Sequence, residues 1–109
     1  MAHGKLGAAS LAANTNTTIY TVPATCIRSD IAIHISNQSA SATGIFIAIT
    51  TNPAAPAAQD WIEAGTTLSV SGVYTNDGLK LSPGESVVVK SANAGVVVRV
   101  NGSELTKLK

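Results

Sequence analysis

The sequence predicts an all-β protein: an antiparallel β-sandwich or jelly roll of roughly seven to eight short strands with an extended N-terminal arm. Valine and isoleucine dominate the apolar residues and recur in short runs, some with a strict period of two. Turn residues separate these runs about every ten residues, and no segment has a convincing helical period. Because 109 residues form one domain, we expect an arm over residues 1–17 and a β-sandwich over residues 18–109.

Alternating side chains define the strands of the first half. The arm is small and polar without a sustained period, which favours an extended or mobile segment. TTIYTVPA is a short strand that Pro23 ends, because proline has no N–H to donate. CIRSDIAIHISN places Ile27, Ser29, Ile31, Ile33 and Ile35 on a core face and Arg28, Asp30, Ala32, His34 and Ser36 on the other. GIFIAIT is nearly all apolar, which predicts a central strand covered on both faces.

The second half begins with TNPAAPAAQDWIEAG, a stiff crossing with one helical turn at AAQDW, where Trp61 and Ile62 anchor the chain to the core. TTLSVSGVYT points Leu68 and Val70 inward and bends at Gly72, and NDG at residues 76–78 is typical of a turn. LKLSPGE is a strand with a Pro-Gly turn. The final valine runs form an antiparallel hairpin around SANAG, with Val87 and Val89 facing Val96, Val98 and Val100.

Charge and cysteine content exclude several classes of protein. A net charge of +1 argues against a nucleic-acid partner, which requires concentrated basic residues. The charged fraction, 12%, is about half the roughly 25% usual for a soluble domain, so we expect much of the surface to be buried against partners. Cys26 has no internal disulfide partner, and the chain shows neither a signal peptide nor a membrane span. These features predict either synthesis in a reducing cytoplasm or a fold that needs no disulfides, and they predict no membrane partner.

No arrangement of reactive side chains predicts catalysis. His3, His34, Cys26, Asp60 and Glu63 lack the spacing of metal ligands, so we expect no metal and no cofactor. A triad of Ser29, His34 and Asp30 fails because neighbouring strand residues point to opposite faces. Phosphate-binding glycine loops and nucleophile elbows are also absent from the sequence. We therefore predict a protein that is not an enzyme.

Trp61 allows one alternative, a ligand-binding surface. Asp60 and Glu63 bracket this single tryptophan, and with Tyr74 they would form a platform for a carbohydrate. The competing interpretation is that Trp61 anchors the crossing and that the two carboxylates cap turns or face a partner. Convergence of the carboxylates on an open pocket would favour the platform.

The order of segments resembles small virion structural proteins of tailed bacteriophages. The resemblance spans about Leu11 to Gly102 and includes "YTVPA", "PAAPAAQDWIE", "GLKLSPGE" and the valine-rich final strands. It implies a β-sandwich subunit of the particle, either a capsid decoration (cement) protein or a neck, tail or fibre-associated component. No catalytic residue is implied. The expected location is the virion, after synthesis in the bacterial host cytoplasm.

The expected partners are further copies of this chain, as a trimer or ring, and other virion proteins such as the major capsid protein. We expect the arm to contact them through Leu6 and Leu11, because a flexible arm can order on a neighbour. We expect the outward face of the isoleucine strand to contribute Arg28, Asp30 and His34, which would orient the contact.

Overall fold

The computed structural model describes residues 3–106, and most of them lie in β-strands. They are β1 (His3–Leu11), β2 (Thr17–Thr21), β3 (Cys26–Asn37), β4 (Thr43–Thr50), β5 (Trp61–Leu68), β6 (Val73–Leu81), β7 (Ser86–Ser91) and β8 (Val96–Thr106). A short 3-10 turn, η1 (Ala58–Asp60), precedes β5. Two four-stranded sheets form, sheet A in the order β1-β8-β3-β6 and sheet B in the order β2-β7-β4-β5. The prediction of an all-β, antiparallel fold is confirmed.

Strand pairing is nested along the chain. The first strand pairs with the eighth, the second with the seventh, the third with the sixth and the fourth with the fifth, all antiparallel. Further pairs, β3 with β8 and β4 with β7, complete the sheets. The predicted hairpin of the two valine-rich strands is therefore wrong, because β7 lies in sheet B and β8 in sheet A. Their buried valines meet instead in the core between the sheets.

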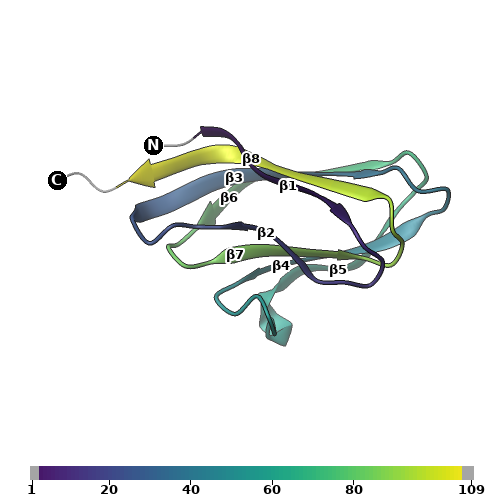
Figure 1. Ribbon diagram of the computed structural model, residues 1–109, viewed down its shortest axis with the longest axis horizontal. Coiled ribbons are helices and arrows are strands. Elements are labelled where there is room, and N and C mark those ends of the chain that lie inside the picture. Colours follow the sequence, from purple (N-terminus) through teal and green to yellow (C-terminus); the bar gives the residue numbers. More distant parts are fainter. Residues whose placement is uncertain (1–2, 107–109) are drawn as a thin grey trace.

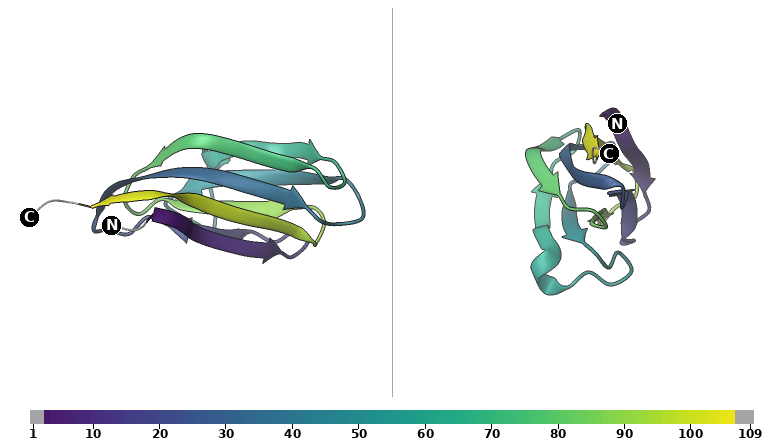
Figure 2. Two further views of the ribbon diagram at one scale, coloured as in Figure 1. Left: turned by 90° about the horizontal axis from the view of Figure 1, so that it is seen from above. Right: turned by 90° about the vertical axis from the view of Figure 1, so that its left-hand side faces the viewer.

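The two sheets stack as layers of an elongated molecule, 50 × 27 × 19 Å along its principal axes (Figures 1 and 2). The strands run along the long axis, so their connections gather at two ends. The end that includes the start of β1 and the end of β8, here the terminal end, also holds the connections 22–25, 51–60 and 82–85. The opposite end, here the far end, holds the connections 12–16, 38–42, 69–72 and 92–95.

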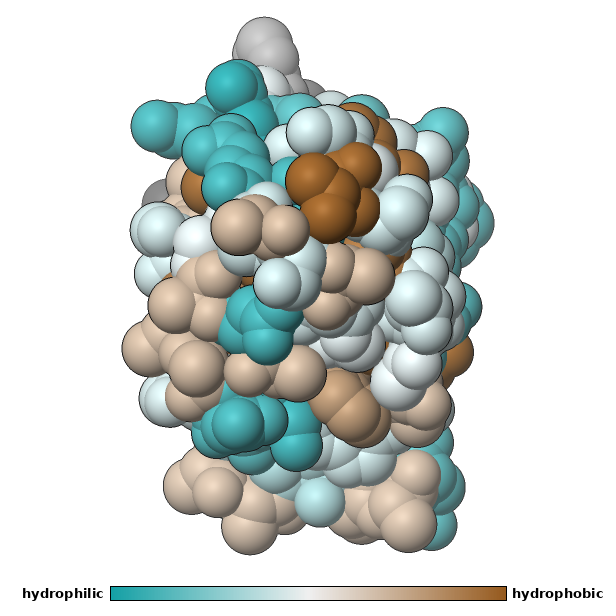
Figure 3. All heavy atoms as spheres, turned by 90° about the vertical axis from the view of Figure 1, so that its right-hand side faces the viewer, coloured by the Kyte–Doolittle hydropathy of each residue, from teal (hydrophilic) through white to brown (hydrophobic). Residues whose placement is uncertain are grey.

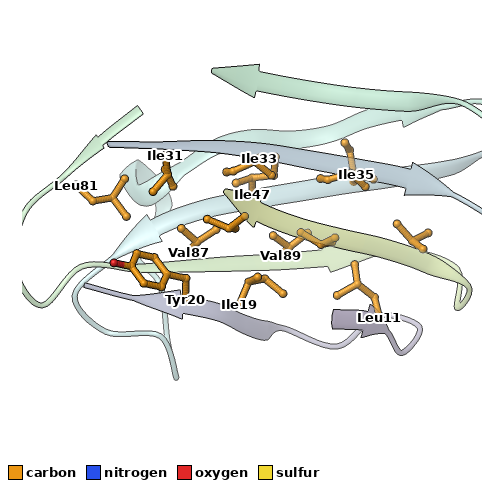
Figure 4. Close-up of a cluster of buried hydrophobic side chains, with 14 of the residues drawn as sticks. Leu11, Ile19, Tyr20, Ile31, Ile33, Ile35, Ile47, Leu81, Val87 and Val89 are labelled. Atoms are coloured by element: carbon orange, nitrogen blue, oxygen red, sulfur yellow. The ribbon is translucent and has the colours of Figure 1, made fainter. Parts of the chain in front are cut away.

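Isoleucine and valine side chains from both sheets fill one continuous core (Figure 4). Ile31, Ile33 and Ile35 of β3 meet the inward valines of β7 and β8 with exposures of 3% or less. Burial of one such side chain stabilises a fold by about 1.5–3 kcal/mol. β4 is an inner strand of its sheet, as predicted. Its outward-facing Ala48 is fully buried, but Gly44 and Phe46 on the same face are partly exposed, so the predicted covering of both faces is only partial.

The expected N-terminal arm is not confirmed, because most of it is a strand. β1 pairs with β8 from His3 to Leu11 at the edge of sheet A. The register shifts between Lys5 and Gly7, and there β1 passes against β2. A β-carbon on Gly7 would collide with the backbone carbonyl of Ile19. Glycine therefore allows the two sheets to approach closely along this side.

At several bulges, side chains point to a different face from the one predicted by the alternation of inward and outward residues. The register of β3 against β8 shifts between Cys26 and Arg28, so Ile27 is 47% exposed and not a core residue. Val70 lies in the connection after β5 and is 52% exposed, so its predicted inward orientation is wrong. NDG is no chain reversal, because β6 continues through it. There Asp77 and Gly78 form a bulge opposite Ala32.

Two predicted local features are present. Ser82 to Glu85 form a tight turn in which the Glu85 N–H donates to the Ser82 carbonyl at 3.1 Å, with Gly84 at a φ of +87°. Proline followed by a residue of positive φ is the type II pattern. The helical turn expected in AAQDW is η1, and the Asp60 carboxylate caps it by accepting from the Ala57 N–H at 2.9 Å.

Candidate interaction surfaces

The outer face of sheet A carries three of the five residues expected to contact a partner. Arg28 Nε lies 3.0 Å and Lys80 Nζ 3.8 Å from the same Asp30 oxygen. These side chains are 42–67% exposed, and exposed pairs of this kind contribute about 0–1 kcal/mol. His34, also exposed, lies opposite Arg99 on β8. The face therefore offers charged groups for orientation, and partner contact there remains a prediction.

The two leucines expected in the arm belong to the body of the fold. Leu11 is 3% exposed and part of the core, so the expectation that it contacts a partner from a mobile arm is corrected. Leu6 lies at the bulge of β1 and packs partly buried against the core. Apolar surface is exposed elsewhere on sheet A. Ile27, turned outward by its bulge, is accompanied by Leu105, which is 36% exposed and lies opposite Arg28.

The residues of the alternative ligand platform are not brought together. Ile47 of β4 lies opposite Glu63, and the next residue, Ala48, lies opposite Trp61, so Ile62 bulges out of register. Paired residues of neighbouring strands share a face. Trp61 therefore lies on the outer face of sheet B with Ala48, whereas Glu63 lies on the inner side with Ile47. Ile62 is 42% exposed and does not anchor the crossing, contrary to expectation.

Trp61 packs against the outer face of sheet B. Its ring meets that of Phe46 edge to face, with centroids 6.3 Å apart and planes at 82°. The Lys90 ammonium lies 4.4 Å from the Phe46 centroid and 5.9 Å from the Trp61 centroid. Such cation–π contacts stabilise by about 0.5–1 kcal/mol at exposed sites. The aromatic pair therefore already has a cationic side chain from the same chain over it.

Glu63 and Tyr74 lie at the opposite edge of the sandwich from β1 and β2. The Glu63 carboxylate accepts a hydrogen bond from Thr66 Oγ1, and Asn76 Nδ2 donates to the Tyr74 hydroxyl at 3.2 Å. Burial, chiefly, and the nearby Glu63 carboxylate raise the pKa of Tyr74. Each of these hydrogen bonds lies within one edge strand, β5 for Glu63 and β6 for Tyr74, and Asp60 does not take part in either. Residues 3–106 contain no detected pocket on which these carboxylates converge.

A buried polar cluster links the two sheets near the terminal end. The Tyr20 hydroxyl donates to Glu104 Oε2 at 2.6 Å and lies 2.7 Å from Ser29 Oγ. Ser29 is fully buried while Asp30 is half exposed on the other face, which agrees with the exclusion of a Ser-His-Asp triad. Burial and the Glu104 charge raise the pKa of the neighbouring Cys26 thiol. The sequence signal for this cluster, a serine among the isoleucines of the core face, indicates a buried hydrogen bond.

Two asparagines organise the far end. The Asn37 amide nitrogen lies within hydrogen-bond distance of the carbonyls of Ser41, Leu68 and Ser69, and its oxygen accepts from the Ser39 N–H and hydroxyl. Asn93 donates from its backbone to Thr43 Oγ1 at 3.0 Å and from its amide to the Ala42 carbonyl at 3.2 Å. The connections 38–42, 69–72 and 92–95 are thus joined to one another.

Among residues 3–106, no three His, Cys, Asp or Glu side chains are grouped so that they could hold a metal ion. The same residues include no helix long and apolar enough to cross a membrane. Comparison with family models, with curated proteins and with solved structures found no match to this chain.

Proposed function

We propose that this chain is a non-enzymatic structural protein of a tailed-bacteriophage virion, most specifically a capsid decoration (cement) protein that stabilises the particle by bridging other virion subunits. It acts as a homo-oligomer, such as a trimer or ring, and contacts the major capsid protein. It is made in the host cytoplasm and resides in the virion.

The nested strand order is the observation that carries this proposal. Pairing of the first strand with the eighth, and so on inward to the fourth and fifth, gives two four-stranded sheets. This supports a jelly roll, the eight-stranded double-sheet form used by viral capsid and lectin domains. It agrees with the resemblance of the segments between Leu11 and Gly102 to small phage structural proteins. Because a fold hosts many functions, the surface must also fit the role.

The surface of the described residues supports burial against other proteins. Five large apolar side chains are at least 36% exposed: Ile27, Ile62, Val70, Val73 and Leu105. Only 12% of the residues carry a charge. A free monomer normally keeps its surface charged to remain soluble, whereas subunit contacts favour uncharged surface with apolar residues at the centre.

The carbohydrate-binding alternative loses its geometric basis. Lectins share the jelly roll, but Trp61 and Glu63 lie on opposite faces of sheet B. The Lys90 ammonium also lies over the aromatic pair. A glycan array that binds the unaltered protein but not a folded Trp61→Ala variant would restore this alternative.

Quantitative mass spectrometry of virions from the phage that encodes this chain tests the proposal. Decoration of the head requires on the order of hundreds of copies, whereas a closed ring at the neck or tail requires about six or twelve. A count in the hundreds supports the cement role. A count near six or twelve would transfer the protein to the neck or tail, and its absence from virions would overturn the proposal.

A further inference from the structure

At the far end of the molecule, the connections between strands carry no charged or histidine side chain. Its four connections read AANTN (12–16), QSASA (38–42), SVSG (69–72) and ANAG (92–95). The terminal end, in contrast, includes Asp60 and Glu85 in its connections. Connections in soluble proteins ordinarily lie in water and bear polar and charged residues. An end built from four separate uncharged connections is therefore a property of the fold as a whole, and no single segment of the sequence displays it.

Apolar side chains are exposed at this end. Val70 is 52% and Val73 64% exposed, the highest values among the large hydrophobic residues that the structure describes. Figure 3 looks onto the far end, where hydrophobic (brown and tan) and pale residues cover most of the face and hydrophilic (teal) residues occur in separate spots. Exposed apolar surface with polar surroundings is typical of a protein contact site.

The far end is also held in one arrangement. Asn37 joins the connections 38–42 and 69–72, and Asn93 joins 38–42 to 92–95. The Gln38 N–H donates to the Gly95 carbonyl at 3.0 Å, and the Asn14 N–H donates to the Ser91 carbonyl at 2.8 Å. Three connections are thus hydrogen-bonded to one another, and the fourth, 12–16, is bonded to the last residue of β7, which directly precedes 92–95. A surface ordered before binding loses less conformational entropy when it binds.

We propose that the far end is the surface by which this protein attaches to the particle shell, and that the shell surface receiving it is uncharged. The inference rests on the proposed function and names the contact surface and the chemistry of its partner. Charge complementarity carries it. A charged group buried against a surface without a matching charge loses its hydration without compensation. An end without charge therefore fits a partner surface that also has none.

The size of the far end bears on which partner fits. The two shorter dimensions of the molecule give an end of about 500 Å², less than the roughly 800 Å² that each partner buries in a stable complex. One end-to-end contact with a second copy is too small for a lasting dimer. Several copies held together and bound to a shell add their weak contacts through multivalency, so a shell is the fitting partner.

Lysine and glutamate substitutions at matched alanines test the inference. Ala40 and Ala94 are exposed in connections of the far end, and Ala24 and Ala54 are exposed in connections of the terminal end. Because all four methyl groups are exposed outside the strands, each variant should fold. The probe is the virion of the phage that encodes this chain, prepared from a strain with its gene deleted. Co-sedimentation measures the binding of each purified variant to these particles.

We expect both signs of charge at residues 40 and 94 to weaken binding at least about tenfold, the effect of about 1.4 kcal/mol. The same substitutions at residues 24 and 54 should change binding less than about twofold. Weakening by glutamate but strengthening by lysine, or the reverse, would show a charged partner and overturn the inference. Equal effects at the two ends, or effects only at the terminal end, would also overturn it.

The unaltered protein distinguishes the two proposals. If it binds the particles but the far-end variants bind equally well, only the attachment surface is wrong. If it neither binds the particles nor occurs in virions, the proposed function fails and this inference fails with it. Sedimentation velocity of the protein alone tests whether the far end instead contacts other copies of this chain. If charges at the far end abolish self-association and leave particle binding unchanged, the far end is a contact between copies and the inference is wrong.

Discussion

The hydroxyl of Tyr20 donates a hydrogen bond of 2.6 Å to the carboxylate of Glu104, 84 positions away in the chain. Tyr20 belongs to β2 of sheet B and Glu104 to β8 of sheet A. Ser29 of β3 completes the contact at 2.7 Å. Hydrogen bonds to charged groups are stronger than neutral ones, so this cluster joins the two layers near the terminal end.

Removal of the Tyr20 hydroxyl should destabilise the protein. We expect Tyr20→Phe to lower the free energy of unfolding by about 1–3 kcal/mol, because Ser29 and Glu104 lose their partner in a buried site. Tyr74→Phe is the matched control and should cost less, since its hydroxyl accepts only a longer bond from Asn76. Urea unfolding measures the loss of stability in both variants, provided that the dependence of the unfolding free energy on urea concentration is unchanged. A Tyr20→Phe variant as stable as the unaltered protein would mean that the cluster contributes nothing.

Stability should fall at alkaline pH because of the same tyrosine. Burial, followed by the hydrogen bond to Glu104, raises the pKa of Tyr20 from 10.0 to about 12. The folded state then keeps a proton that the unfolded state has lost. The contribution is complete below pH 10 and is lost as the pH rises to about 12, at a cost of about 2–3 kcal/mol.

Unfolding free energies measured between pH 9 and pH 12 test this expectation, with the range set by the tyrosine pKa values. Tyr20→Phe should show a shallower fall than the unaltered protein. Tyr74→Phe should remove only the share due to Tyr74, whose pKa burial also raises. If the unfolding free energy fell equally steeply with pH in Tyr20→Phe and in the unaltered protein, the raised pKa of Tyr20 would not be the cause.

Gly7→Ala should destabilise the fold, because a β-carbon there would collide with the Ile19 carbonyl. We expect a loss of about 1–3 kcal/mol, typical of overpacking. Gly44→Ala is the control, since its nearest neighbours would lie at 3.8 Å and the substitution should be neutral or slightly stabilising. Thermal unfolding compares the two. Equal melting temperatures would indicate that β1 is not held against β2, as expected of an arm.

Asn37 should be among the most sensitive polar residues. Its amide serves carbonyls of two connections while it is 1% exposed. We expect Asn37→Ala to cost about 2–4 kcal/mol, and Asn37→Asp to cost at least as much because a carboxylate cannot donate to those carbonyls. Asn93→Ala, at a half-buried site, should cost less. If denaturant unfolding showed a larger loss of stability for Asn93→Ala than for Asn37→Ala, the hydrogen bonds assigned to Asn37 would be contradicted.

Lys90 should stabilise the aromatic pair on sheet B. We expect Lys90→Met, which keeps the apolar stem, to cost about 0.5–1 kcal/mol and to shift the fluorescence of Trp61, the sole tryptophan. Lys80→Met is the matched control. Its ammonium is exposed and 3.8 Å from Asp30, so both the stability and the emission should stay unchanged. An unchanged emission spectrum in Lys90→Met would place the ammonium away from the rings.

Alternation of side chains predicted which residues face the core wherever the strand pairing is regular. Ile31, Ile33 and Ile35 are buried as expected, and the Pro83-Gly84 turn follows from the φ preferences of those two residues alone. Ile27 and Ile62 were assigned wrongly because each is the extra residue of a bulge. A bulge reverses the face of the following residues, and its position depends on the partner strand.

For the candidate surfaces, prediction from the sequence was partial. Arg28, Asp30 and His34 share the outer face of sheet A because their spacing of two matches the strand period. Trp61 and Glu63 have the same spacing, yet the Ile62 bulge separates them. The buried cluster of Tyr20, Ser29 and Glu104 joins three strands that are distant in the sequence. Only one local feature could have predicted it, the serine among the isoleucines of the core face.

The sequence by itself determined that the chain is all-β, most of the residues that form the core, and most of the places where the chain turns, because these depend on side-chain hydrophobicity and on the φ preferences of proline and glycine. Only the tertiary structure decided how the strands pair. β1 joins β8 through backbone hydrogen bonds that need no side-chain period, and a buried valine looks the same in the sequence whether its partner lies on a neighbouring strand or across the sandwich. The uncharged far end likewise exists only once four connections meet.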